Sequence, residues 1–320
     1  MWLLYLPLVV PALAGAAARP LAARLEPRHA TWLLTGAAVA LAACSLAALA
    51  LLAAYAAARA PFLAAAGDYS QQVVRRGAPI PAAAGVAAAL ALTGAAVAVT
   101  VMVRSRARAL AESYRRAAGL HAEDGIVVVP GPAIEAYALP GRPGRIVVSG
   151  RLLDCLDDRR QAALIAHEQA HLASRHHLFT TVARLAAAAN PLLVPVARSV
   201  DYTVERWADE HAATVTSDRR LVAETIGQVA LLAGPRLTGS RRRRTAGMVL
   251  GIVGSRTPRV SLAWAGPVPR RVAALLTSPP RRQTILVAAS TVIVLMAGAA
   301  ALLAARDLHA LLELAQGSRG

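Results

Sequence analysis

The sequence predicts a mainly α integral membrane protein, with about four transmembrane helices and one α+β domain between the third and the fourth. Hydrophobic residues make up 56% of the 320 residues but aromatic residues only 4%, and the mean hydropathy of +0.47 is high for a soluble protein. Four apolar stretches are long enough to cross a bilayer, which takes about 20 residues. The charged segment 104–283, between the third and fourth stretches, carries the polar motifs.

The apolar stretches divide the chain into regions. They cover Trp2 to about Ala18, Thr31–Ala57, Ile80–Val103 and Thr284–Ala305. We therefore expect a membrane region with three transmembrane helices at 1–103, a soluble domain at 104–283, a fourth transmembrane helix at 284–306 and a short tail at 307–320.

The first stretch has a second interpretation, a cleaved signal peptide, because its end is rich in small residues. A signal peptide carries positive charge before its apolar run. Here the charge follows the run, at Arg19, Arg24 and Arg28, and none precedes it. We therefore predict that the first span is retained.

Arginine placement predicts the orientation of the spans. All 35 basic residues are Arg, and they cluster after the third span at 104–116 and before the fourth at 270–282. Cytoplasmic loops carry such an excess. We therefore expect a multi-pass protein of a bacterial cell membrane whose domain 104–283 faces the cytosol. The two cysteines, Cys44 and Cys155, form neither a CxxC pair nor a disulfide framework, which fits a cytosol-facing protein.

The soluble segment contains a metal-ligand pattern, I-A-H-E-Q-A-H at 165–171. On a helix, His167 and His171 lie one turn apart on the same face, so both rings can bind one metal ion. Glu168 lies about 100° around the helix and can reach a water on that ion. The alternative is a surface helix that carries two histidines by chance.

A third ligand is available downstream, in V-E-R-W-A-D-E-H-A-A. Glu205 could complete a His₂Glu set, and Asp209, four residues on, could accept the free N–H of a ligand histidine. The alternative is an ordinary acidic helix. Two further histidines, His176 and His211, lie close to these motifs and are either solvated or part of the cleft.

The segments around the motifs predict local structure. Residues 125–150 alternate short β-branched runs with Pro and Gly turns, which indicates a sheet of two or three strands. Asp157 or Asp158 can cap the next helix, which we expect to run from about Arg159 past His177. Residues 178–200 are apolar but interrupted by Arg184 and Asn190-Pro191, so they form either a soluble segment or a hairpin that enters the membrane.

Taken in order, these motifs resemble a known family. The series E-A-Y-A-L-P-G-R-P-G-R-I-V-V-S-G-R-L-L-D-C-L, A-L-I-A-H-E-Q-A-H, E-R-W-A-D-E-H-A-A and P-R-R-V-A-A-L-L is similar to the BlaR/MecR-type membrane metallopeptidases and, more distantly, to the HtpX and CAAX-protease group. Both are gluzincins. The resemblance implies a zincin-like α+β peptidase domain at 104–283. Beta-lactam receptors of that family carry a large extracellular sensor after the fourth span, whereas only the tail 307–320 follows here, so this kind of sensing is not expected.

The resemblance also implies a role for each motif residue. His167, His171 and Glu205 would bind Zn²⁺, Glu168 would be the general base, and Asp209 would support a ligand from outside the coordination sphere. The strand around Ala136, Tyr137 and Ala138 would be the edge on which a substrate peptide lies extended.

The function expected from this resemblance is zinc-dependent hydrolysis of peptide bonds on the cytosolic side, with a cytosolic transcriptional repressor as the protein substrate. The alternatives are a membrane-protein quality-control protease of the HtpX type and a non-hydrolytic signal transducer that keeps the zinc site. Residues 104–283 carry 27 Arg against 14 Asp and Glu, with a run at Arg241–Arg244. Because aromatic residues do not alternate with this run, we expect it to face the lipid bilayer and expect no nucleic-acid partner.

Overall fold

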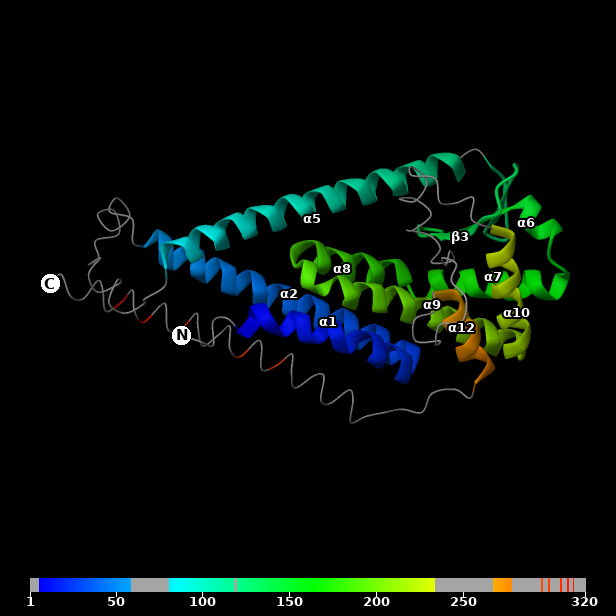
Figure 1. Cartoon of the computed structure of the whole chain (residues 1–320). Coiled ribbons are helices and arrows are strands. Elements are labelled where there is room, and N and C mark those ends of the chain that lie inside the picture. The colour runs from blue at the N-terminus through cyan, green and yellow to red at the C-terminus, as the bar shows by residue number, and fades with distance from the viewer. Residues whose placement is uncertain are drawn as a thin grey trace.

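The computed structural model describes residues 6–58, 81–117, 120–233 and 267–277, with a few isolated positions further on. Long helices extend from one end of the molecule, and a small sheet with shorter helices forms the other end (Figure 1). The predicted fourth span, the Arg241–Arg244 run and the tail lie outside these continuous segments.

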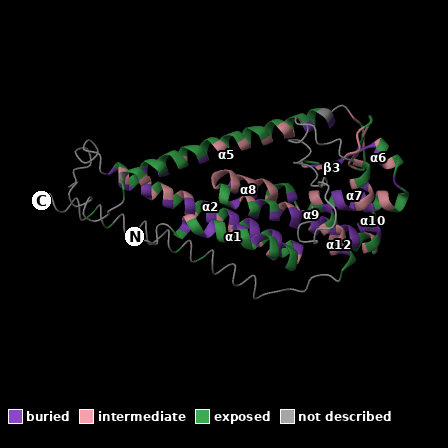
Figure 2. Ribbon diagram, in the orientation of Figure 1, coloured by how far each residue is buried: buried purple, intermediate pink, exposed green. Residues whose placement is uncertain are grey.

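Among the described residues, three helices are long and apolar enough to cross a membrane, and each overlaps one of the first three predicted stretches. They are α1 (Leu6–Arg24), α2 (Pro27–Ala57) and α5 (Ala82–Ala117). With 31 and 36 residues, α2 and α5 are about 46 and 54 Å long, more than the ~30 Å of a hydrocarbon core, so their ends extend beyond it. Most of α5 is exposed although its sequence is apolar, as a lipid-facing helix should be (Figure 2).

The sheet has four strands, one more than the sequence indicated. They are β1 (Ala122–Glu123), β2 (Ile126–Val129), β3 (Ala136–Leu139) and β4 (Arg145–Ser149), in the order β1-β2-β4-β3. Strand β4 pairs parallel with β2 and antiparallel with β3, which forms an edge. The additional strand β1 turns into β2 through Asp124 and Gly125, both at positive φ, and its two residues are too few to show an alternating pattern.

Two short helices follow the sheet. After α6 (Gly150–Asp154), Asp157 caps helix α7 (Asp158–Ala173) by accepting a hydrogen bond from the backbone N–H of Arg160 at 2.9 Å. The prediction that this helix continues past His177 is wrong. Arg175 adopts a left-handed conformation with φ of 49°, which ends the α7 turn, and a separate helix begins at His176.

That helix, α8 (His176–Ala189), forms a hairpin with α9 (Val194–Thr216) through the short 3₁₀ turn η2 (Pro191–Leu193). The hairpin lies along the candidate membrane helices α1, α2 and α5 (Figure 1). At its turn, Asn190 Nδ2 donates a hydrogen bond of 2.9 Å to Ser45 Oγ near the middle of α2. Ser45 in turn donates to the Pro7 carbonyl of α1 at 2.7 Å. The interrupted segment 178–200 is therefore a helical hairpin packed beside two candidate spans.

The apolar core at the sheet-bearing end of the molecule surrounds the first turns of α7. Helix α10 (Arg219–Ala233) and helix α12 (Pro267–Leu276) pack on α7 and α9 with the sheet, and their buried side chains form one apolar cluster. Ala163, Leu164 and Ala166 of α7 belong to it. This packing fixes the rotation of α7 about its axis and turns its histidine face toward α9.

Candidate metal centre

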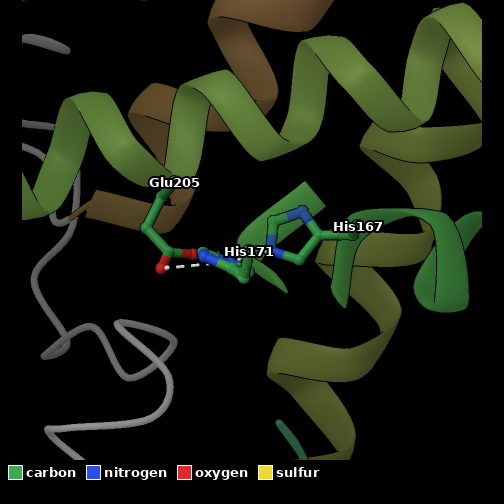
Figure 3. Close-up of side chains that lie close together, drawn as sticks. All are labelled: His167, His171 and Glu205. Atoms are coloured by element: carbon green, nitrogen blue, oxygen red, sulfur yellow. Dashed lines mark hydrogen bonds and ion pairs between the residues drawn. The ribbon is translucent and has the colours of Figure 1, made fainter. Parts of the chain in front are cut away.

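Helices α7 and α9 bring the two sequence motifs together. His167, His171 and Glu205 point toward one another from these two helices (Figure 3). The Nε2 atoms of the histidines are 3.2 Å apart, and the Glu205 oxygens lie 3.6 Å from His167 Nε2 and 3.8 Å from His171 Nε2. Ligands of a tetrahedral ion at about 2.0–2.1 Å are separated by roughly 3.4 Å, so the three atoms are spaced to share one ion.

An unsatisfied polar atom at the same place supports a metal ion. Among the described residues, Glu168 Oε1 is buried and makes no hydrogen bond. Buried carboxylate oxygens are normally paired, because leaving them unpaired costs free energy. A water beside a cation that the three donor atoms hold would satisfy Glu168. The donor set thus fits a metal ion chemically as well as geometrically.

An outer pair of side chains holds His167 in position. Asp209 Oδ1 lies 3.0 Å from His167 Nδ1, so the other ring nitrogen, Nε2, faces Glu205 and His171. Arg271 of α12 donates to both oxygens of Asp209, at 2.7 and 2.6 Å, and its Nη1 lies 2.8 Å from Glu205 Oε2. One buried guanidinium therefore contacts two carboxylates of α9.

The charges of this cluster shift the pKa of each titratable group. Burial alone would lower the pKa of His167, but Asp209 and Glu205 raise it to about 10. Burial lowers the pKa of His171 to about 4. Burial opposes ionisation of Glu205 and Asp209, yet Arg271 holds the pKa of both carboxyl groups below their usual range. Burial raises the pKa of Glu168 to about 7, which suits a group that exchanges protons near neutral pH.

His176 lies directly behind His171. The Nδ1 atoms of the two rings are 3.0 Å apart, and the His176 ring packs against Trp207 with centroids 4.7 Å apart. Burial and the neighbouring His171 lower the pKa of His176 to about 2, so its ring is neutral and can accept a hydrogen bond. The left-handed conformation of Arg175 turns the chain back toward α7, and this turn brings His176 to His171.

The other predicted site residues lie around this centre. His211 is exposed on α9. Ala136, Tyr137 and Ala138 form β3 at the sheet edge beside α7. The backbone N–H of Ala138 donates to the Glu168 carboxylate, so this edge touches the candidate base directly.

Arg271 is the residue that the motif analysis missed. It belongs to the segment P-R-R-V-A-A-L-L and was interpreted as part of a cytoplasmic charge cluster, whereas only 1% of it is exposed. A spacing rule could not find it, because it lies 62 residues from Asp209. The only signal was indirect: the surrounding helix is amphipathic, and one of its two adjacent arginines has to face the apolar side.

A largely buried His₂Glu set with a neighbouring acid, together with three candidate membrane helices among the described residues, is the arrangement of a membrane metallopeptidase. A sequence model of Peptidase family M48 matches residues 100–279, which is more than half of the chain. The chain therefore belongs to Peptidase family M48. Neither the curated proteins nor the solved structures gave a match.

Proposed function

We propose that this membrane metallopeptidase is a zinc endopeptidase that cleaves protein substrates on the cytosolic side of the membrane. The observation that carries the proposal is the meeting of His167, His171 and Glu205 with Glu168 at their side, because two imidazoles, one carboxylate and a free acid are what catalytic zinc sites use. A non-hydrolytic transducer would need the ligands but not the fourth residue.

In this proposal each residue of the site has a separate role in peptide-bond hydrolysis. Zinc, when bound, supplies Lewis-acid activation of the scissile carbonyl and of the attacking water. Glu168 takes the proton from that water and passes it to the leaving amine, which its pKa of about 7 allows in both directions. Asp209 keeps the proton of His167 on Nδ1, and Arg271 keeps Asp209 ionised.

Strand β3 offers a substrate a backbone to pair with. It is an edge strand, and an extended peptide can add to such an edge by main-chain hydrogen bonds. The Ala138 N–H now donates to Glu168, so a substrate that pairs at Ala138 would release the carboxylate toward the water. Flexible linkers and termini fit this geometry better than folded cores do.

The height of the metal centre relative to the membrane helices restricts the substrate further. Thr203, two residues before Glu205, accepts a hydrogen bond of 2.9 Å from Thr31, which lies in the first turns of α2. The centre is therefore level with the end of the candidate spans where Arg19, Arg24 and Arg28 gather, and such arginine clusters favour the cytosolic side. A substrate has to come close to the bilayer surface.

Two substrate classes fit a centre in this position. The resemblance to BlaR/MecR-type peptidases favours a cytosolic repressor, cleaved at one site. The membrane-proximal position favours the alternative, quality control of membrane proteins as in the HtpX type. Both use the same residues, so the substrate and not the site distinguishes them.

The test compares wild-type protein with Glu168→Gln, which should keep the metal but lose the base. Purified in detergent and loaded with zinc, the wild type should cleave a flexible peptide library and the variant should not, at equal zinc content. In cells, Glu168→Gln should stabilise one regulator if the first class is right. Accumulation of many misfolded membrane proteins would identify the second, and equal hydrolysis by both proteins would reject the endopeptidase.

A further inference from the structure

An apolar pocket lies beside the candidate metal centre, between helices α7, α10 and α12. His167 and Glu168 form part of its wall, so the pocket reaches a candidate ligand and the candidate base. We call it the α10 pocket. Five aliphatic side chains form most of the remaining wall: Ala163 and Leu164 from α7, and Val222, Ile226 and Val229 from α10.

The polar groups in the wall of the α10 pocket are almost all engaged elsewhere. Thr225 donates its hydroxyl to a carbonyl of its own helix at 2.8 Å, and Arg271 pairs with Asp209 and Glu205. Among the described residues, this leaves Glu168 Oε1 as the buried side-chain atom of the wall with neither a hydrogen bond nor an ion pair. A charged or polar group placed here would lose its water and find almost no partner, so the pocket favours an apolar group.

The α10 pocket has room for one small group. Its free volume is about 20 Å³, and a water molecule needs about 10–15 Å³ on the same measure. A methyl group is about as large as a water molecule, so one methyl group fits, whereas an isobutyl or benzyl group does not. The aliphatic wall belongs to the buried core of this end of the molecule, and close-packed side chains resist expansion. The pocket therefore selects by size as well as by polarity.

The role of Glu168 indicates which part of a substrate meets this pocket. In the proposed function, Glu168 passes a proton to the leaving amine. The substrate residue that supplies this amine must then lie against Glu168, which the α10 pocket shares with the site of hydrolysis. The side chain of that residue is therefore placed to enter the pocket.

We propose that the α10 pocket receives the side chain of the substrate residue on the amine side of the scissile bond and restricts it to a single methyl group, as in alanine. Ile226 and Val229 are the specificity-determining residues, because their branched side chains occupy the space that a larger substrate group would need. Ala163, in the same wall, has almost nothing to remove. This inference rests on the proposed function and names its substrate class, peptides with alanine directly after the cleaved bond.

The test uses ligands that bind without being cleaved. Peptide hydroxamates with a methyl, an isobutyl or a benzyl group next to the zinc-binding group are titrated into the zinc-loaded full chain in detergent, and calorimetry gives their affinities. The methyl compound should bind at least about tenfold more tightly than the isobutyl compound, since one misplaced methylene in an apolar pocket changes binding by about that factor or more.

Variants of the wall then test its assignment. Ile226→Ala and Val229→Ala widen the pocket, so each should lower the preference for methyl over isobutyl by about tenfold. Two such variants are used because removal of a core side chain destabilises a protein by an amount that depends on the site, and thermal unfolding in detergent shows which of them are folded. Val268→Ala is the matched control and should keep the wild-type preference, because Val268 belongs to the same core but does not line the pocket.

The outcomes separate this proposal from the proposed function. Equal affinity of the wild type for the three compounds, or an unchanged preference in the folded wall variants, would overturn the role of the pocket. Absence of binding of every compound at full zinc content would overturn it as well. Cleavage of a peptide library without preference at this position would support the endopeptidase and reject the pocket. Size-dependent binding of the hydroxamates without hydrolysis of any peptide would support the pocket and reject the endopeptidase.

Discussion

Arg271 donates two hydrogen bonds to Asp209, from Nε to Oδ2 at 2.7 Å and from Nη2 to Oδ1 at 2.6 Å. Both side chains are almost completely buried. Asp209 in turn lies 3.0 Å from His167 Nδ1, so these two hydrogen bonds link helix α12 to a candidate metal ligand through one carboxylate. The centre is thus completed by a residue outside both motifs.

Removal of this guanidinium should destabilise the protein strongly. Arg271→Met leaves Asp209 and Glu205 as buried carboxylates without their cation, and a broken buried pair costs about 3–5 kcal/mol. Arg271→Lys keeps the charge but cannot form the two-pronged contact, so it should recover only part of the loss. Thermal unfolding in detergent measures both variants against Arg220→Met, whose exposed site should be neutral. A melting temperature unchanged in Arg271→Met would show that these hydrogen bonds do not stabilise the fold.

The contact between His176 and His171 predicts a measurable effect on metal affinity. When His171 binds through Nε2, its Nδ1–H donates to the neutral ring of His176. Loss of such an orienting partner lowers metal affinity by roughly 10- to 100-fold. We expect this for His176→Ala, with partial recovery in His176→Asn, whose amide oxygen can accept the same hydrogen bond. The neighbouring His177 is exposed, so His177→Ala is the control. Competition with a zinc chelator gives the affinities, and equal values for the two alanine variants would refute the role of His176.

Zinc binding should release a proton. In the metal-free protein His167 has a pKa of about 10, so its ring is protonated at pH 7, and a metal ion can bind only to the neutral form. The affinity for zinc should therefore fall as the pH falls, and about one proton per ion should appear at pH 7. Calorimetric titrations in buffers of different ionisation enthalpy measure that number. A heat of binding that is independent of the buffer would contradict the prediction.

Close packing of the α8–α9 hairpin against α1 predicts a steric effect at Gly15. A Cβ atom added there would lie 3.1 Å from the Leu192 carbonyl oxygen and 3.4 Å from Pro195 Cγ. Gly15→Leu should therefore push the hairpin turn away and cost about 1–3 kcal/mol. Gly36 on α2 has open space around it, so Gly36→Leu should cost nothing by this route. The unfolding temperatures of the two variants test this prediction. Equal temperatures would show that the hairpin does not pack closely against Gly15.

The parts of the fold that depend on short-range patterns could be predicted from the sequence. Long apolar runs predict the helices α1, α2 and α5. Spacings of four residues in the two motifs predict which side chains meet between α7 and α9. Both patterns are local, because a helix fixes which residues share a face.

Other features depend on tertiary contacts or on an exceptional backbone. Nothing in the residue type of Arg175 predicts a positive φ, yet that conformation separates α7 from α8 and brings His176 to His171. The arginines 270 and 271 look alike in sequence, but only packing decides that one reaches Tyr202 and the other Asp209. The sequence does not decide the structure of the hairpin 178–200, because its interrupting polar residues, such as Asn190, are satisfied by partners on another helix.

The separation of 62 residues between Asp209 and Arg271 also causes a delay during protein synthesis. At 5–20 residues per second, the ribosome needs roughly 3–12 seconds to add them. During that interval the ligands on α7 and α9 already exist, but the guanidinium that neutralises Asp209 and Glu205 does not. A nascent chain therefore lacks the contacts of Arg271 with the candidate metal centre until α12 has been made and has docked.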